Sequence, residues 1–319
     1  MPARPARRLP ANARLLRTMV VLELFWAAGC AVWFAWLFDW GPAPAMLAGL
    51  AVPLGTHATV IAINFGIAAA AGSPTPPGHR LGLVGALRVY LREVVDSIRV
   101  FQWAQPWLAR RPLPGESIGP QPAGAPLPVV LVHGYLCNRQ LWRPFAGWLA
   151  KRGHAVQGVD LEPIFGSIDT YVPLLAEAVG ALRERTGAER VALVCHSMGG
   201  LAARAYLRAH PDAPVAAVVT IGTPHRGTFH ARLGQGANAV QMRPDSRWLQ
   251  ALAQSEGPAL RARFTIIFSH HDNIVAPQAN QTLPDAKVLA FSGMGHLTLA
   301  LDARVWLATG QSIAAGQQA

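Results

Sequence analysis

The sequence predicts an α/β domain with a mainly parallel sheet, preceded by two transmembrane helices. Near the N-terminus, two apolar runs are each long enough to cross a hydrocarbon core as helices. After residue 126, short apolar runs alternate with helical stretches, a pattern typical of a parallel sheet covered on both faces. The predicted parts are a basic N-terminal tail (1–18), a transmembrane helical hairpin (19–71), an amphipathic helix with a proline-rich linker (72–126) and the α/β domain (127–319).

The charge distribution argues against a nucleic-acid partner, although the net charge of the 319-residue chain is +11. Five arginines lie within residues 1–17, and others cluster at 80–111 beside apolar segments. A nucleic-acid groove needs basic residues interleaved with stacking aromatic side chains, and the sequence has no such run. Basic residues next to apolar spans indicate contact with anionic lipid headgroups instead. The 3 cysteines do not form an even disulfide framework.

The two apolar runs predict a helical hairpin within the membrane. Residues 19–38 carry only one charge, Glu23, and residues 45–71 have polar interruptions such as Asn64. A helix of roughly 20 residues crosses the hydrocarbon core, and only a short turn joins the two runs. The alternatives for the first run are a signal peptide and a lipoprotein cleaved before Cys30.

The distribution of arginines predicts the orientation of this hairpin. Five arginines precede the first span, none lies in the turn, and Arg80, Arg88 and Arg92 follow the second span. The positive-inside rule therefore places both termini in the cytoplasm. Glu23 and Asn64 then lie within about two helical turns of the inner boundary, and polar groups in lipid seek partners. We expect them to face each other; the alternative is that Glu23 reaches for the headgroups.

Residues 81–101 predict an amphipathic helix. Its apolar side consists of Val84, Leu87, Leu91, Val94, Ile98 and Phe101, and its polar side of Arg88, Arg92, Asp96 and Arg99. Such a helix lies along a membrane surface, or it packs on the hairpin or on the α/β domain, and these alternatives stay open. Residues 111–128 hold six prolines and three glycines, which predicts a semi-extended linker.

The α/β domain is predicted from its alternating strand and helix patterns. The expected strands are 129–132, 155–159, 191–194, 215–221, 264–268 and 287–291, and the expected helices between them are 139–152, 172–185 and 198–210. Parallel strands with crossover helices bury both faces of the sheet, and about 190 residues suffice for such a core.

A serine stands at the apex of a predicted strand–turn–helix unit. Residues 191–194 are apolar, Ser197 follows in a tight turn, and a helical pattern begins at Met198. This arrangement predicts a nucleophile elbow, in which a strained turn exposes the serine hydroxyl and needs small residues two positions away. Gly199 meets that need, whereas Cys195 stands where glycine is usual. The alternative is a buried strand followed by an ordinary serine N-cap.

A nucleophilic serine needs a base to take its proton and an acid to orient that base. Asp272 follows a predicted strand, where its carboxylate would emerge at the same sheet edge as Ser197. His296 follows the last predicted strand, and the glycines beside it allow the loop to bend over the serine. The rivals are Asp285 for the acid, and His196 and His225 for the base.

The tetrahedral intermediate of an ester also needs two backbone N–H donors for its oxyanion. Met198, directly after the serine and at the start of a predicted helix, supplies one. The loop after the first strand of the domain supplies the other, and Tyr135 is the expected donor because Gly134 gives the loop backbone freedom. The oxyanion hole is therefore predicted at Tyr135 and Met198.

With these motifs, residues 127–300 resemble the bacterial lipase and esterase branch of the α/β-hydrolase superfamily, in particular its triacylglycerol lipase-like members. The matching motifs are His133-Gly134, His196-Ser197-Met198-Gly199-Gly200, Ile221-Gly-Thr-Pro-His-Arg-Gly-Thr228, Asp272 with Ile274, Val275 and Pro277, and Gly295-His296. The resemblance implies an α/β-hydrolase fold with Ser197 as nucleophile and Asp272 and His296 as its partners. Such enzymes carry a lid, which we expect as a small insertion at about residues 228–260.

We therefore expect a membrane-anchored serine hydrolase that cleaves carboxylic esters, lipid-like ones above all, through an acyl-enzyme on Ser197. The expected partners are an ester or lipid substrate and membrane lipids, at the bacterial inner membrane with the catalytic domain facing the cytoplasm. No cofactor is expected, because zinc-binding and phosphate-cradling motifs are missing from the sequence; a calcium ion, as in some lipase relatives, stays open, as does the oligomeric state. The alternatives are an acyltransferase of the same fold and a non-catalytic, membrane-tethered binding or scaffold protein.

Overall fold

The computed structural model describes residues 9–318 and contains a six-stranded sheet in the order β2-β1-β3-β4-β5-β6. All neighbouring strands are parallel. The strands are β1 (Val129–Val132), β2 (Val156–Val159), β3 (Val191–His196), β4 (Val215–Ile221), β5 (Phe264–Ser269) and β6 (Lys287–Phe291). The predicted parallel α/β sheet is confirmed.

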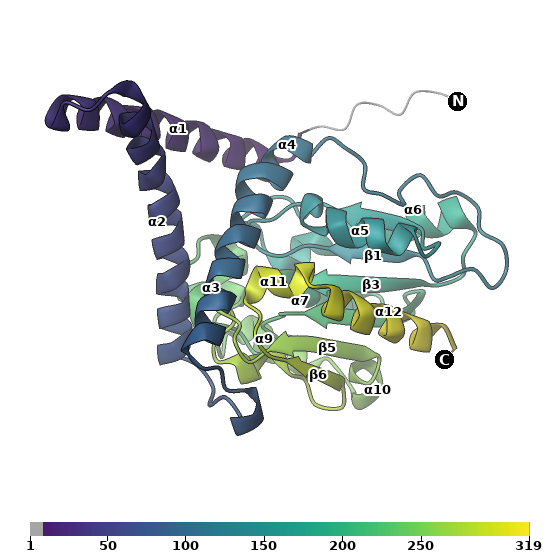
Figure 1. Ribbon diagram of the computed structural model, residues 1–319. Coiled ribbons are helices and arrows are strands. Elements are labelled where there is room, and N and C mark those ends of the chain that lie inside the picture. The colour runs from purple at the N-terminus through teal and green to yellow at the C-terminus, as the bar shows by residue number, and fades with distance from the viewer. Residues whose placement is uncertain (1–8, 319) are drawn as a thin grey trace.

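Helices cover both faces of this sheet (Figure 1). One hydrophobic core lies under α6 (Val172–Thr186) and α7 (Met198–Ala209). The other lies under α5 (Arg143–Ala150), α11 (His296–Leu301) and α12 (Ala303–Gln318). Strands β1 and β3 are buried along their whole length, which explains why their sequences are continuous apolar runs rather than alternating ones.

The remaining helices lie at the N-terminus and between β4 and β5. The N-terminal ones are α1 (Ala11–Phe38), α2 (Pro42–Ala70), α3 (Leu83–Ser97), a π-helical turn (Ile98–Ala104) and α4 (Gln105–Leu108). The insertion between β4 and β5 contains α8 (Gly236–Gln241), α9 (Arg247–Gln254) and α10 (Pro258–Arg261). Short 3-10 turns occupy Pro77–His79, Arg139–Trp142, Ile168–Tyr171, Phe229–Arg232 and Gln278–Gln281.

The first helix begins within the segment that was predicted as a basic tail. Residues 1–8 of that tail lie outside the described residues, but α1 is helical from Ala11 onward. Its first turn is buried against the loop after β1: Asn12 Nδ2 donates to the carbonyl of Leu136 at 2.6 Å, and Asn138 Nδ2 donates to Asn12 Oδ1 at 3.0 Å. The start of α1 is therefore part of the packed structure.

Helices α1 and α2 pack on each other next to the turn that joins them, and separate further along. They approach closely near Gly49, where an added Cβ would lie 2.8 Å from the Cβ of Ala31. Beyond Pro53, which interrupts the hydrogen-bond ladder of α2, the helix runs beside α3 (Figure 1). There the hydroxyl of Tyr90 donates to the carbonyl of Ala58 at 3.0 Å.

The predicted pairing of Glu23 with Asn64 is wrong. Glu23 Oε2 accepts a hydrogen bond from Gln102 Nε2 at 3.1 Å, and within residues 9–318 no hydrogen bond joins it to Asn64. The physical reason is that the second half of α2 packs on α3 and leaves α1, so Asn64 no longer lies opposite Glu23. The partner of Glu23 comes from the π-helical turn, which the sequence pattern did not predict.

The length and composition of α1 and α2 are those of membrane spans, and signal sequences share these properties. Their large apolar side chains are mostly outside the protein core: Phe25 is 72% exposed and Trp36 is 79% exposed. The two helices are therefore not core helices, and this part of the molecule presents a large apolar surface.

Helix α3 exposes most of its large apolar side chains and buries two acidic ones. Leu83, Val84, Leu87, Leu91 and Val95 are between 45% and 86% exposed. The buried side chains of the helix include Glu93, Asp96 and Ser97 instead. The packing alternative is therefore correct: α3 contacts α2 and the α/β domain. The predicted polar side is only partly right, because Asp96 is buried while Arg88, Arg92 and Arg99 are exposed, and five large apolar side chains stay uncovered.

The predicted linker is also packed more tightly than its proline content indicated. Glu116 is buried, and its carboxylate accepts hydrogen bonds from the backbone N–H of Leu113 at 3.1 Å and of Gly158 at 3.2 Å. The backbone N–H of Val156 donates to the carbonyl of Gly115 at 3.1 Å. Residues 113–116 thus lie against β2 as part of the domain.

Candidate active site

Ser197 occupies a strained turn between β3 and α7. Its backbone has φ 55° and ψ −128°, a combination that non-glycine residues rarely adopt. The turn is held by three hydrogen bonds: the N–H of Ser197 donates to the carbonyl of Ile221 at 2.8 Å, and its own carbonyl accepts from Gly200 N–H at 3.0 Å and from the hydroxyl of Thr223 at 2.9 Å. The serine side chain caps no backbone N–H of α7, so the ordinary N-cap alternative does not apply.

Close packing explains the small residues around the serine. A Cβ on Gly199 would lie 2.6 Å from the backbone oxygens of Val132 and His133, because α7 starts directly against β1. A Cβ on Gly134 would lie 2.6 Å from the Cβ of Ser197. Cys195, on the other side of the serine, is fully buried in the core between the sheet and α7.

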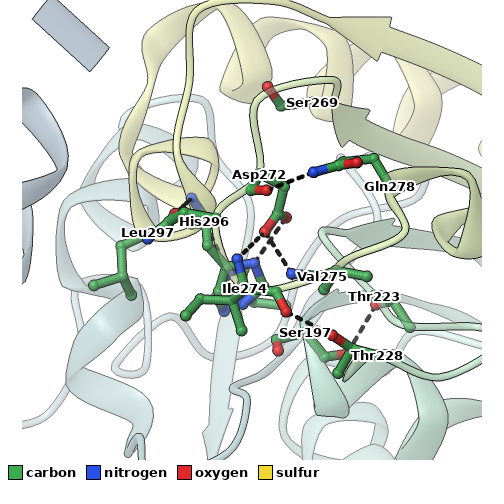
Figure 2. A network of polar contacts seen from close by, with 12 residues as sticks. Ser197, Thr223, Thr228, Ser269, Asp272, Ile274, Val275, Gln278, His296 and Leu297 are labelled. Carbon is green, nitrogen blue, oxygen red and sulfur yellow. Dashed lines mark hydrogen bonds and ion pairs between the residues drawn. The ribbon is translucent and has the colours of Figure 1, made fainter. Parts of the chain in front are cut away.

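Asp272 and His296 form the central polar contact of the site (Figure 2). His296 Nδ1 lies 2.8 Å from Asp272 Oδ2, and both side chains are buried. The other carboxylate oxygen, Asp272 Oδ1, accepts the backbone N–H groups of Ile274 and Val275, each at 2.8 Å. The carboxylate is therefore fixed by its own loop. The rival acid, Asp285, forms an ion pair with Arg261 at 2.8 Å instead.

The imidazole of His296 is held from several sides. Its backbone N–H donates to Asn273 Oδ1 at 2.9 Å, and its carbonyl lies 3.0 Å from His196 Nε2. Burial by itself would lower the pKa of His296, but the charge and the hydrogen bond of Asp272 outweigh burial and raise it above its usual value. Because Nδ1 faces Asp272, Nε2 is the nitrogen left for a reacting group.

Ser197 lies in the same small region as this pair (Figure 2). The link is Gly222: it follows Ile221, which binds the serine backbone, and a Cβ on it would lie 3.2 Å from His296 Nδ1. Within the described part of the chain, Ser197 Oγ makes no hydrogen bond. The structure thus contains the contact between Asp272 and His296 and leaves the serine hydroxyl without a partner among these residues. The hydrogen bond between a catalytic serine and its base is often long in unliganded enzymes.

The two predicted oxyanion donors flank the serine. Met198 is the first residue of α7, and Tyr135 follows Gly134, which touches the serine side chain. The backbone N–H groups of both residues have no hydrogen-bond acceptor among residues 9–318. The hydroxyl of Tyr135 donates to the carbonyl of Gln235 at 2.8 Å and accepts from its N–H at 3.0 Å, which fixes this loop.

The predicted lid region divides into two parts with different environments. Its first part contacts the Tyr135 loop through Gln235 and exposes apolar side chains such as Leu233. Its second part is core: Leu249 is buried, and the indole of Trp248 donates to Asp169 Oδ2 at 2.8 Å. Packing therefore accounts for Trp248 and Leu249.

Two residues that surround the histidine, Asn273 and Glu93, are not predicted from the sequence as parts of the site. Asn273 had a signal, since it is adjacent to the predicted Asp272. Glu93 had none, because it is one polar residue of an amphipathic helix more than 200 positions away. Its carboxylate nevertheless accepts the backbone N–H of Leu297, next to His296, at 2.9 Å.

Comparisons with known proteins agree with this architecture. Residues 128–244 match the family model described as alpha/beta hydrolase fold. The mature form of Bacillus licheniformis lipase BlEst2 superimposes with a TM-score of 0.53 and 20% sequence identity, over 62% of this chain and 99% of that one. Aspergillus fumigatus lipase B gives a TM-score of 0.54 and 19% identity, over 60% of this chain and 55% of that one. This chain therefore contains an α/β-hydrolase fold, and the predicted fold class and the resemblance to that family are confirmed.

Proposed function

We propose that this protein is a membrane-anchored serine hydrolase that cleaves carboxylic esters through an acyl-enzyme on Ser197. The observation that carries the proposal is the 2.8 Å contact between Asp272 and His296 beside a serine in a strained elbow. An α/β-hydrolase fold supports hydrolysis in general, and the site geometry supports the roles proposed within it.

In the proposed reaction, Ser197 Oγ attacks the ester carbonyl while His296 Nε2 takes the hydroxyl proton. The charge of Asp272 stabilises the imidazolium that results. The N–H groups of Tyr135 and Met198 bind the oxyanion of the tetrahedral intermediate. When the intermediate collapses, the alcohol leaves with the proton from His296 and the acyl group stays on Ser197. Water, deprotonated by His296, then releases the acid and restores the serine.

A lipid-like substrate is supported by the apolar surfaces around the site. Phe229 and Leu233 are exposed on the lid part that contacts the Tyr135 loop, and α3 presents five apolar side chains outward next to α11. Long apolar acyl chains are stabilised by such surfaces and are poorly soluble in water. The names of the two superimposed lipases agree with this substrate class.

Membrane anchoring is proposed from α1 and α2, whose large apolar side chains are mostly exposed. The arginine distribution supports two spans at the bacterial inner membrane, with both termini and the catalytic domain in the cytoplasm. The uncovered face of α3 supports a second contact, in which this helix lies along the membrane surface.

The test uses the full-length protein in detergent, with Ser197→Ala as the nucleophile variant and Ser255→Ala, an exposed serine, as the matched control. Covalent labelling by a fluorophosphonate and turnover of p-nitrophenyl esters of increasing chain length are measured together. We expect both signals in the wild type and in Ser255→Ala, and neither in Ser197→Ala. Labelling without turnover that becomes turnover when an alcohol is added would indicate an acyltransferase. A folded wild-type protein with no labelling would contradict the proposal and leave the scaffold alternative.

A further inference from the structure

Glu93 of α3 is a carboxylate that the proposed mechanism does not use, and it is only 1% exposed. It contacts the start of α11, the helix that begins with His296. Its Oε1 accepts the backbone N–H of Leu297 at 2.9 Å. Its Oε2 accepts the backbone N–H of Thr298 at 3.0 Å and the hydroxyl of the same residue at 2.9 Å.

These contacts replace a cap that α11 lacks in its own sequence. The first N–H groups of a helix have no acceptor within the helix, and a buried N–H without an acceptor is costly. The N-cap of α11 is Gly295, which has no side chain, and the first turn of α11 holds no acidic residue. A carboxylate from the N-terminal segment therefore supplies the acceptors, across more than 200 residues of sequence.

Glu93 packs tightly against the loop that precedes His296. A Cβ on Gly295 would lie well within van der Waals contact distance of Glu93 Oε2, and 3.0 Å from Asn273 Oδ1. Asn273 accepts the N–H of His296, and Glu93 accepts the next two N–H groups along the chain. Three consecutive backbone groups, beginning with that of His296, are thus fixed by two side chains.

Helix α3 also contacts the C-terminal end of α11. Arg92, next to Glu93, forms an ion pair at 2.7 Å with Asp302, the residue that follows α11. Asp96, one turn further along α3, lies 3.0 Å from the hydroxyl of Thr298. The position of α11 relative to the sheet is therefore set by α3, with Glu93 at the end that carries the histidine.

We propose that Glu93 is a positioning residue for His296, so that the N-terminal segment completes the catalytic machinery as well as anchoring it. This inference rests on the proposed hydrolase function. By fixing the backbone of residues 296–298, Glu93 holds the imidazole between Asp272 and the serine hydroxyl. Burial raises the pKa of Glu93, and the N–H groups that it accepts oppose this shift. In its ionised form, Glu93 contributes after Asp272 to the raised pKa of His296.

The test compares Glu93→Gln with Glu116→Gln in the full-length protein in detergent. Glu116 is the matched control because it is also buried and also accepts two backbone N–H groups, but those of Leu113 and Gly158. Two quantities are measured: kcat and KM per active site, counted by fluorophosphonate titration, and hydrogen–deuterium exchange of the peptide 295–301. Counting active sites removes the effect of unfolded protein from kcat.

For Glu93→Gln we expect kcat per active site to fall by about tenfold to hundredfold, with KM unchanged, and the amides of Leu297 and Thr298 to exchange faster. Glu116→Gln should match the wild type in both measurements. A Glu93→Gln variant with wild-type kcat and wild-type exchange would overturn the inference. If the fluorophosphonate does not label the wild type at all, the proposed hydrolase function is wrong. Unchanged hydrogen–deuterium exchange of Leu297 and Thr298 in Glu93→Gln would separately refute the capping of α11 by Glu93.

Gly295→Ala is a second probe in case Glu93→Gln does not fold. The added methyl group displaces the Glu93 carboxylate from α11 but does not remove it. We expect the same loss of kcat per active site and the same faster exchange of Thr298. Wild-type values for Gly295→Ala would contradict the positioning role.

Discussion

The carboxylate of Asp272 and the imidazole of His296 meet at 2.8 Å inside the protein, and the other carboxylate oxygen is occupied by two backbone N–H groups. This arrangement fixes the orientation of the ring, with Nδ1 toward the acid and Nε2 left for a reacting group. It also determines how the protein should respond to pH.

The first prediction concerns the acidic limb of the pH–rate profile. Burial would lower the pKa of His296, but Asp272 raises it above the usual value of a histidine. A general base works in its neutral form, so kcat/KM should fall as the pH drops through this raised pKa, at a higher pH than for an ordinary histidine. Asp272→Asn removes the charge that raises the pKa of His296, so the acidic limb of the variant's pH–rate profile should move to lower pH. Its kcat should fall by about 10³–10⁴-fold. An acidic limb in Asp272→Asn at the same pH as in the wild type would contradict this account.

The second prediction concerns the tight crossing of α7 and β1. Gly199→Ala places a Cβ 2.6 Å from two backbone oxygens that cannot move without the strand, and such overpacking costs about 1–3 kcal/mol. Gly180→Ala is the control, because Gly180 lies in α6 with no atom in the way of a Cβ; it should stabilise the protein by up to about 1 kcal/mol. Thermal unfolding measures both, and equal melting temperatures for the two variants would refute the packing argument.

The third prediction concerns the uncovered apolar face of α3. Leu87→Asp with Leu91→Asp should leave the hydrolysis of short soluble esters unchanged and should lower the hydrolysis of esters embedded in lipid vesicles, because charged groups are costly in a membrane interface. Leu307→Asp on α12 is the control, since Leu307 is 53% exposed on a helix outside the N-terminal segment. If the double variant and the control hydrolyse vesicle esters at the same rate, α3 does not lie on the membrane.

The fourth prediction concerns the buried ion pair of Arg204 and Glu256, whose side chains are 0% and 1% exposed and lie 2.7 Å apart. Glu256→Gln leaves the guanidinium without its charge partner inside the core, which costs about 3–5 kcal/mol. The melting temperature in detergent should fall accordingly, while kcat per active site stays constant. Asp285→Asn, which breaks a more exposed pair with Arg261, should cost under about 1 kcal/mol.

Much of the fold could be predicted because the information is local. The runs that became β1, β4 and β6 were predicted with their observed bounds, since a buried parallel strand is a continuous apolar run between turn residues. Ser197, Asp272 and His296 could be proposed together because parallel strands bring their carboxyl ends to one edge. The final helix, α12, follows α11 after a single residue and was missed.

The errors lie where a contact depends on packing between distant segments. Nothing in the sequence near Glu93 indicates that it would reach the helix of His296, because the acceptor function arises only after α3 has packed. The spacing of the apolar residues in α3 predicted a helix but not which side of it faces the protein. The burial of Glu93 and Asp96 determines that side. The predicted contact of Glu23 failed because α2 leaves α1 beyond Pro53.

The most direct test of the central claim is identification of the residue that a fluorophosphonate modifies in the full-length protein. Mass spectrometry of the labelled, digested protein locates the adduct. We predict one adduct, on Ser197, which disappears when a long-chain ester substrate is present in excess. An adduct on another serine, or no adduct on folded protein, would contradict the proposal that Ser197 is the nucleophile of this enzyme.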